Sequence, residues 1–268
     1  MHMHTSETSR GDIDAHDACI YIYRTMSAAD VLMVVLAATM VAVLALGTFR
    51  AALRAGVSVP GARRAARNVA LALAAWLAFV AALALGGVLP VTARPPRWPL
   101  LPLTAFTAIV LVTRSSSGRR VLSGIPPAWP MVAQTYRVGV ELALFALHAG
   151  GRAPVQITFE GRNFDILVGL SAPLVGWLAS TGRIGAKGAL AWNVLGLAML
   201  ANTVATIASS TPGPLHLDWP GAPFTAITTW PIVWLPAFLM PLAVFLHLVS
   251  LRQNLHRWRA SSAAARPA

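Results

Sequence analysis

Two ionisable side chains, Arg137 and Glu141, lie four positions apart within an apolar stretch of this sequence. Residues four apart share one face of a helix, so these two can form an ion pair. If the helix begins near Met131, Glu141 lies about 15 Å along it, close to the centre of a bilayer. An ionisable side chain at that depth costs at least about 2.5 kcal/mol and usually faces a bundle interior or a wet cavity. The pair therefore predicts either a substrate or proton site, or a structural ion pair that fixes this helix to its neighbours.

A second group of charged and polar side chains follows closely: Glu160, Arg162, Asn163 and Asp165, bracketed by aromatic residues. Asn163 can cap the next helix, and Asp165 can lie in its first turn, where the helix dipole favours a negative charge. Arg162 could pair with Glu160. The alternative is that this outer segment folds back over a cavity that Glu141 lines.

Two histidines, His148 and His216, are weaker candidates for a metal or haem site, and Asp218 could add a carboxylate. Haem iron needs axial ligands that face each other inside the bundle, whereas lone histidines near helix ends are more often structural. A single cysteine excludes a cysteine-based metal cage. We therefore predict no metal and no cofactor.

Familiar catalytic signatures are missing from the sequence. There is no Walker loop, no G-x-S-x-G elbow and no H-E-x-x-H motif. A retinal protein would need a lysine in its last helix, and the one lysine, Lys187, falls in a predicted loop. No class of enzyme is favoured by these patterns.

Membrane-spanning helices must position these side chains. The chain is 56% hydrophobic and only 11% charged, against about 25% charged in an average soluble domain. A helix needs about 20 apolar residues to cross a bilayer. The sequence therefore predicts an all-helical bundle within a single transmembrane domain, residues 26–259. Seven apolar segments approach spanning length: 28–48, 68–90, 98–113, 131–149, 164–181, 188–208 and 224–250.

Basic residues concentrate on alternate loops of this arrangement. By the positive-inside rule, the N-terminus is predicted to be outside and the C-terminus cytoplasmic. The net charge of +12 is then explained by orientation and by anionic lipid headgroups, so no nucleic-acid partner is predicted. The opposite loops carry only Arg94, Arg97, Arg152 and Arg162. The basic residues of the cytoplasmic side are Arg50, Arg54, Arg63, Arg64, Arg67, Arg114, Arg119, Arg120, Arg183, Lys187, Arg252, Arg257 and Arg259.

Local patterns refine the spans. Gly169 and Gly176 share one face of the fifth span, which suits close helix packing. Pro231, Pro236 and Pro241 predict that the last span is kinked or partly unwound.

The connections and the chain ends are predicted to be irregular. Residues 57–61 read as a cytoplasmic turn and residues 115–118 as a flexible inner loop. Residues 1–25 read as a disordered tail or an over-called start before Met26, and residues 260–268 as a disordered cytoplasmic tail.

The segment that carries most of these candidates also resembles a known family. Tyr136-Arg137-x3-Glu141, followed by ITFEGRNFDIL from Ile157 to Leu167, is similar to a family of uncharacterised multi-pass bacterial membrane proteins. The resemblance covers roughly residues 130–180. It implies a location in the bacterial plasma (inner) membrane, and, because the family has no assigned activity, it implies no mechanism.

Two classes of function remain open. The first is a non-enzymatic binding or translocation component, or a subunit of a membrane complex, with a membrane protein or a small lipophilic ligand as its partner. The second is a membrane-embedded enzyme acting on a lipid or isoprenoid, with Glu141, Glu160 or Asp165 as acid–base groups. A deep cavity open to lipid would favour the enzyme if two carboxylates reach one substrate atom. A tightly packed Arg137–Glu141 pair without a cavity would favour a structural role.

Overall fold

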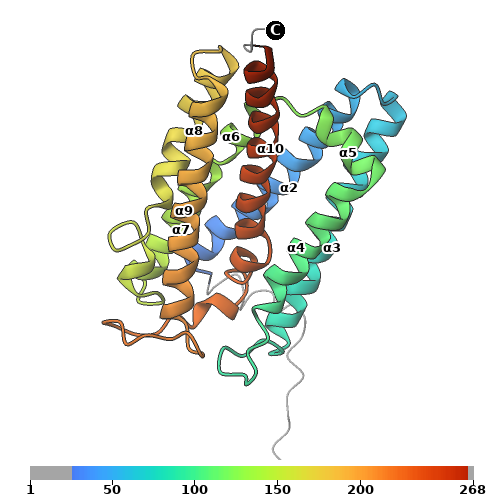
Figure 1. Cartoon of the computed structure of the whole chain (residues 1–268). Helices are drawn as coiled ribbons and strands as arrows, with labels where there is room; N and C mark the ends of the chain where they lie inside the picture. Colours follow the sequence, from blue (N-terminus) through green and yellow to red (C-terminus); the bar gives the residue numbers. More distant parts are fainter. Residues whose placement is uncertain (1–25, 265–268) are drawn as a thin grey trace, which may run out of the picture.

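The computed structural model describes residues 26–264, and all of its regular secondary structure is helical. The predicted tail at residues 1–25, together with residues 265–268, lies outside the described residues. Long helices follow one another in alternating directions, so that the loops gather at two opposite ends of the bundle (Figure 1). The elements are α2 (Ala28–Arg54), α3 (Val59–Leu85), α4 (Leu100–Arg114), α5 (Ser116–Ser123), α6 (Trp129–Ala133), α7 (Tyr136–Ala149), η1 (Val155–Ile157), α8 (Asp165–Ser180), α9 (Ala186–Ser210), η2 (Ala226–Thr228), η3 (Leu235–Leu239) and α10 (Met240–Ala264).

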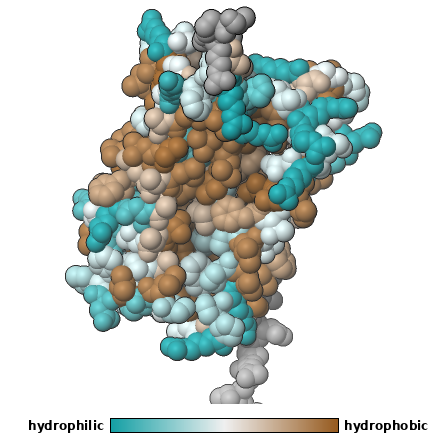
Figure 2. All heavy atoms as spheres, in the orientation of Figure 1, coloured by the Kyte–Doolittle hydropathy of each residue, from teal (hydrophilic) through white to brown (hydrophobic). Residues whose placement is uncertain are grey.

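Four helices of the described residues are long and apolar enough to cross a membrane: α2, α3, α9 and the continuous rod formed by η3 and α10. A fifth is obtained if α4 and α5, which meet at a bend of 80°, are taken as one span. On the face that Figure 2 shows, hydrophobic residues gather across the middle of the molecule, between ends that are richer in hydrophilic residues. The chain is therefore a membrane-embedded helical bundle, as predicted, with four or five helices of spanning length.

Two of the predicted boundaries are wrong because a helix extends further than its apolar run. α3 begins at Val59 instead of near residue 68, since Pro60 stands in its first turn, where no backbone N–H is needed. α10 continues to Ala264, so the described part of the predicted tail 260–268 is helical.

Two further predictions fail between α4 and α7. The predicted loop at 115–118 is the start of α5, where the Ser115 hydroxyl accepts the Gly118 N–H at 3.0 Å and caps the helix. The predicted single span 131–149 is broken between α6 and α7. At this break the Gln134 amide donates to the Ala243 carbonyl at 3.0 Å, which ties the break to α10.

α8 begins inside the protein and not at its surface. Its 16 residues span about 24 Å, less than the ~30 Å of a hydrocarbon core. Its first residue, Asp165, is buried beside Arg137, which lies three turns before the end of α7. The intervening chain, residues 150–164, therefore turns back from the end of α7 into the bundle, and we call it the re-entrant segment. Its buried residues include Ala153, Gln156, Ile157, Thr158 and Asn163.

The stretch before α10 is also irregular, as its prolines predict. Residues 224–239 contain a 3-10 turn and a π-helical turn before α10 begins. Pro241 has no N–H to offer the Ala237 carbonyl, and the Trp76 indole of α3 donates to that carbonyl at 3.0 Å instead. The predicted distortion of the last span is thus confirmed, and a neighbouring helix satisfies the backbone that it frees.

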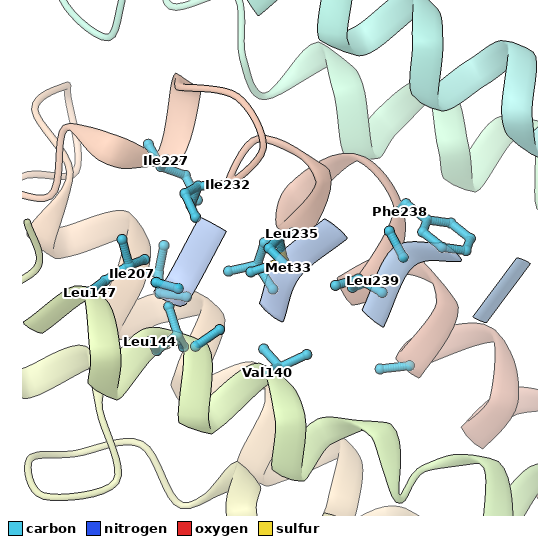
Figure 3. Close-up of a cluster of buried hydrophobic side chains, with 14 of the residues drawn as sticks. Met33, Val140, Leu144, Leu147, Ile207, Ile227, Ile232, Leu235, Phe238 and Leu239 are labelled. Carbon is cyan, nitrogen blue, oxygen red and sulfur yellow. The ribbon is translucent and has the colours of Figure 1, made fainter. Parts of the chain in front are cut away.

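The main apolar core lies between this irregular stretch and helices α2, α7 and α9. In Figure 3, Ile232, Leu235 and Leu239 of this stretch lie in one apolar cluster with Met33 of α2, Leu144 of α7 and Ile207 of α9. Packing of this kind holds the irregular stretch within the bundle. The labelled core residues are Met33, Val140, Leu144, Leu147, Ile207, Ile227, Ile232, Leu235, Phe238 and Leu239.

The predicted small-residue face on α8 is confirmed. A Cβ atom on Gly169 would lie 2.8 Å from the backbone nitrogen of Val138 in α7. A Cβ atom on Gly176 would lie 2.3 Å from Cγ2 of Val132 in α6. The absence of side chains at these two positions lets α8 lie directly against α6 and α7.

The basic loops lie together at one end of the bundle. Gln253, late in α10, donates to the Ile125 carbonyl at 2.8 Å, which joins two of these regions. At the opposite end, Arg152 pairs with Asp30 at the start of α2 at 2.7 Å. Tryptophans accompany the basic side chains of the first end, as is typical of a membrane interface. The contacts are Arg54 over Trp129, Arg183 over Trp177 and Lys187 over Trp258.

Candidate functional site

Arg137 is paired with Asp165 and not with Glu141. Its Nε donates to Oδ2 of Asp165 at 3.1 Å, and its second terminal nitrogen contacts the other carboxylate oxygen. Both side chains are at least nine-tenths buried. The predicted Arg137–Glu141 ion pair is therefore wrong: among the described residues, only Asp165 and Asp30 form ion pairs with an arginine or lysine. The start of α8 within the bundle makes the observed pair possible.

The remaining terminal nitrogen of Arg137 contacts a histidine outside the predicted site. It lies 3.0 Å from Nε2 of His247 on α10. Because a guanidinium only donates, Nε2 must accept, which leaves the proton on Nδ1. Nδ1 in turn lies 2.9 Å from Oδ1 of Asn193 on α9. His247 is therefore neutral in this arrangement, with its tautomer fixed on both sides.

From Asn193 the hydrogen bonds continue towards the basic end of the bundle. Its amide nitrogen donates to the Ser250 hydroxyl at 2.9 Å, and Asn254 donates to the Ser250 carbonyl at 2.8 Å. His247, Ser250 and Asn254 are fully buried and lie three and four residues apart on one face of α10. That spacing of polar residues within an apolar helix was the available signal for this part of the site.

Glu141 is held by Asn163 of the re-entrant segment. The amide nitrogen of Asn163 lies 2.8 and 2.7 Å from the two carboxylate oxygens. Its amide oxygen accepts from the backbone N–H of Asp165 at 3.1 Å and from the Thr203 hydroxyl at 2.6 Å. Since a backbone N–H can only donate, this contact fixes the orientation of the amide. Asn163 is therefore not the N-cap that was predicted, since Phe164 occupies that position, but it accepts the N–H of the first residue of α8 and also holds Glu141.

These contacts join α7, the re-entrant segment, α8, α9 and α10 into one buried structure, which we call the polar chain. Its two parts meet at the ion pair between α7 and α8. One part leads through Asn163 to Glu141, and the other leads through His247 towards the basic end. The polar chain consists of Glu141, Asn163, Asp165, Arg137, His247, Asn193, Ser250 and Asn254.

A cavity of about 40 Å³ adjoins the polar chain. Arg137, Glu141 and Asp165 line it, and most of the remaining wall is apolar, from α7, α9, η3 and α10. One water needs roughly 10–15 Å³ of such space. The cavity thus has room for a few water molecules or a small ion, next to two carboxylates and a guanidinium.

The other predicted site residues lie outside this arrangement. Glu160 is exposed, and Arg162 stacks over Trp219 with 5.1 Å to the ring centroid, so the suggested Glu160–Arg162 pair is not formed. His148 contacts the Ala153 carbonyl through Nδ1 at 2.9 Å, a structural role. Within residues 26–264, no group of three or more histidine, cysteine or acidic side chains could hold a metal ion. The suggested metal site involving His216 has no such group around it.

No protein-family model, no curated protein and no solved structure matches this chain significantly. The resemblance noted for residues 130–180 therefore stays a prediction. What the fold and the geometry define is a class: a membrane-embedded helical protein with a polar site buried among its last four helices.

Proposed function

We propose that this chain is a seven-span, non-enzymatic protein of the bacterial inner membrane that binds or translocates a small polar solute or ion. The polar chain carries the proposal. A buried ionisable group in a membrane is costly, and it usually marks the path of an ion, a proton or a substrate. Here three such groups adjoin one cavity. In the proposed topology, the short helix α6 completes the crossing of α7, and the re-entrant segment completes the crossing of α8.

Discontinuous helices support a binding or translocation role. In membrane proteins, irregular backbone at membrane depth is tolerated where protein or a water-filled cavity surrounds it. Transporters often build their sites at half-helix termini and unwound backbone near the midplane. The start of α8 and the unwound stretch before α10 meet around this cavity.

The alternative, an enzyme acting on a lipid or isoprenoid, is less well supported. Its two carboxylates are both engaged, Asp165 by Arg137 and Glu141 by Asn163. The cavity volume of about 40 Å³ suits a few water molecules or a small ion. A small translocated solute or ion fits both the engaged carboxylates and the small cavity.

The proposed topology predicts which loops face the outside. In a Cys19→Ser background, Leu215→Cys should react with an impermeant thiol reagent in intact cells, because Leu215 is exposed in the loop after α9. Ser116→Cys, at the basic end, should react only after permeabilisation. Labelling of position 215 only after permeabilisation would reverse the orientation.

A path for a polar solute predicts that the cavity becomes accessible to water. Val140→Cys, whose side chain lines the cavity, should react with a small charged methanethiosulfonate in the Cys19→Ser background. Leu142→Cys, two residues along α7 and exposed on the lipid side, should not react, because a thiol in hydrocarbon stays protonated. If neither cysteine reacts while Leu215→Cys does, the polar chain is a static structural element and the proposed function fails.

A further inference from the structure

The polar chain carries one more acidic group than its basic groups compensate. The Arg137 guanidinium uses Nε and one terminal nitrogen on Asp165 and the other terminal nitrogen on His247. His247 is neutral, because its Nε2 accepts from Arg137. The positive charge of Arg137 and the negative charge of Asp165 cancel. The negative charge of an ionised Glu141 would remain without compensation.

Among the described residues, no cation forms an ion pair with Glu141. Its side chain is 1% exposed, and its hydrogen bonds come from a single neutral amide, that of Asn163. The other titratable groups that line the same cavity are Arg137 and Tyr136 from α7 and Asp165 from α8, while α9 presents Thr203. An isolated buried carboxylate is strongly unfavourable, and such a group neutralises. Glu141 therefore requires one bound positive charge.

The surroundings of Glu141 suit a proton better than a metal ion. The amide nitrogen of Asn163 has two hydrogens, and one of them serves the Ile157 carbonyl at 3.0 Å. The other is shared between the two carboxylate oxygens, so one oxygen can carry a proton, whereas hard metal ions require several oxygen ligands around them. Within residues 26–264, no cluster of metal-ligating side chains surrounds it. The cavity beside it has room for water, which can deliver or remove a proton.

We propose that Glu141 binds one exchangeable proton and that this proton is the species handled at the site. The inference rests on the proposed function, since it names what occupies the cavity. Asn163 is a positioning residue that holds the carboxyl group. When the proton leaves, Glu141 becomes a second carboxylate one helical turn from Arg137, and it competes with Asp165 for the guanidinium. Loss of the proton therefore weakens the contact that joins α7 to α8.

Infrared difference spectroscopy of the purified protein in lipid tests the proton directly. A protonated carboxylic acid has a carbonyl stretch that a carboxylate lacks, and the band shifts in D2O if its proton exchanges. We expect such a band in the unmodified protein, decreasing as the pH is raised and shifting in D2O. Glu141→Gln should remove it. Glu160→Gln, the same change at an exposed position outside the site, should leave it intact.

A second variant keeps the test decisive if the first one misfolds. If Glu141→Gln does not fold, Glu141→Asp keeps an acid at the site and should shift the band without abolishing it. A band that survives in folded Glu141→Gln, or no band at any pH, overturns the inference. A band that neither titrates nor exchanges in D2O also overturns it, because the proton would then be a fixed part of the fold.

Flux measurements separate this inference from the proposed function. In proteoliposomes with an imposed potassium diffusion potential, an internal pH dye should report proton entry that Glu141→Gln abolishes and Glu160→Gln preserves. Uptake of radioactive sodium without proton entry would reject the proton and keep the translocation role. A charged thiol reagent that fails to reach Val140→Cys, together with no flux of either ion, would reject both.

Discussion

Replacing Arg137 by methionine is expected to lower the free energy of unfolding by about 3–5 kcal/mol, the cost of breaking a buried ion pair. The reason lies in the partner that remains. Asp165 would be left without its cation in the interior, where keeping the charge and taking up a proton at neutral pH both cost free energy, and His247 would lose the donor at Nε2. Unfolding in mixed micelles of increasing denaturant fraction, followed by circular dichroism, measures the loss.

The paired substitution provides the control. Asp165→Asn alone should cost a similar amount, because it strands the Arg137 charge. Arg137→Met combined with Asp165→Asn should recover much of the loss, since neither charge is then unpaired. If the two single losses simply add, the two side chains do not stabilise each other and the geometry is wrong. If Glu141→Gln instead recovers the stability lost in Arg137→Met, then Arg137 is paired with Glu141, as the spacing in the sequence suggested.

Gly169→Ala is expected to destabilise the protein by about 1–3 kcal/mol, the usual cost of overpacking a tight contact. The added methyl group would lie 2.8 Å from the backbone nitrogen of Val138, and a helix backbone cannot rotate away as a side chain can. α7 and α8 would have to separate one turn from Asp165. The variant should therefore also disturb the polar chain, and the infrared carbonyl band of Glu141 should report this change.

Gly47→Ala is the matched control for this prediction. Gly47 also lies within a helix, but a Cβ there would be 3.6 Å from the Trp129 ring, an ordinary contact. Removing a helical glycine should then be neutral or stabilise by up to about 1 kcal/mol. Equal destabilisation by the two substitutions would show that the α7–α8 approach is not specifically tight. Gly176→Ala should cost less than Gly169→Ala, because its nearest neighbour is the end of the Val132 side chain.

The helical character, the small-residue face of α8 and the distortion before α10 could be predicted because each depends on a local pattern. Apolar runs of about 20 residues predict spans, and proline removes a backbone donor wherever it stands. The boundaries of α3 and α5 could not be predicted from hydropathy, because polar residues and Pro60 continue or cap these helices near the surface. An apolar run does not reveal that α8 begins deep in the bundle.

The candidate residues were identified more reliably than their partners. Arg137, Glu141, Asn163 and Asp165 do come together, but the i, i+4 spacing suggested a pair within α7. Spacing along a helix shows which side chains share a face. It does not show which other element will face them, and here the re-entrant segment decided the pairing. The part contributed by His247 belongs to contacts more than 50 residues apart in the sequence, and no local pattern encodes these.

The start of α8 inside the bundle, at Asp165, has a consequence for the way this protein enters the membrane. On insertion scales, an arginine or an aspartate at the centre of a lone helix costs about 2.5–3.5 kcal/mol. α7 alone would present an uncompensated Arg137 to lipid, and α8 alone would begin with an uncompensated Asp165. The two charges neutralise each other only once the chain between them has folded back. We therefore expect the hairpin from Trp129 to Ser180 to leave the translocon for lipid as one unit, with its ion pair already made.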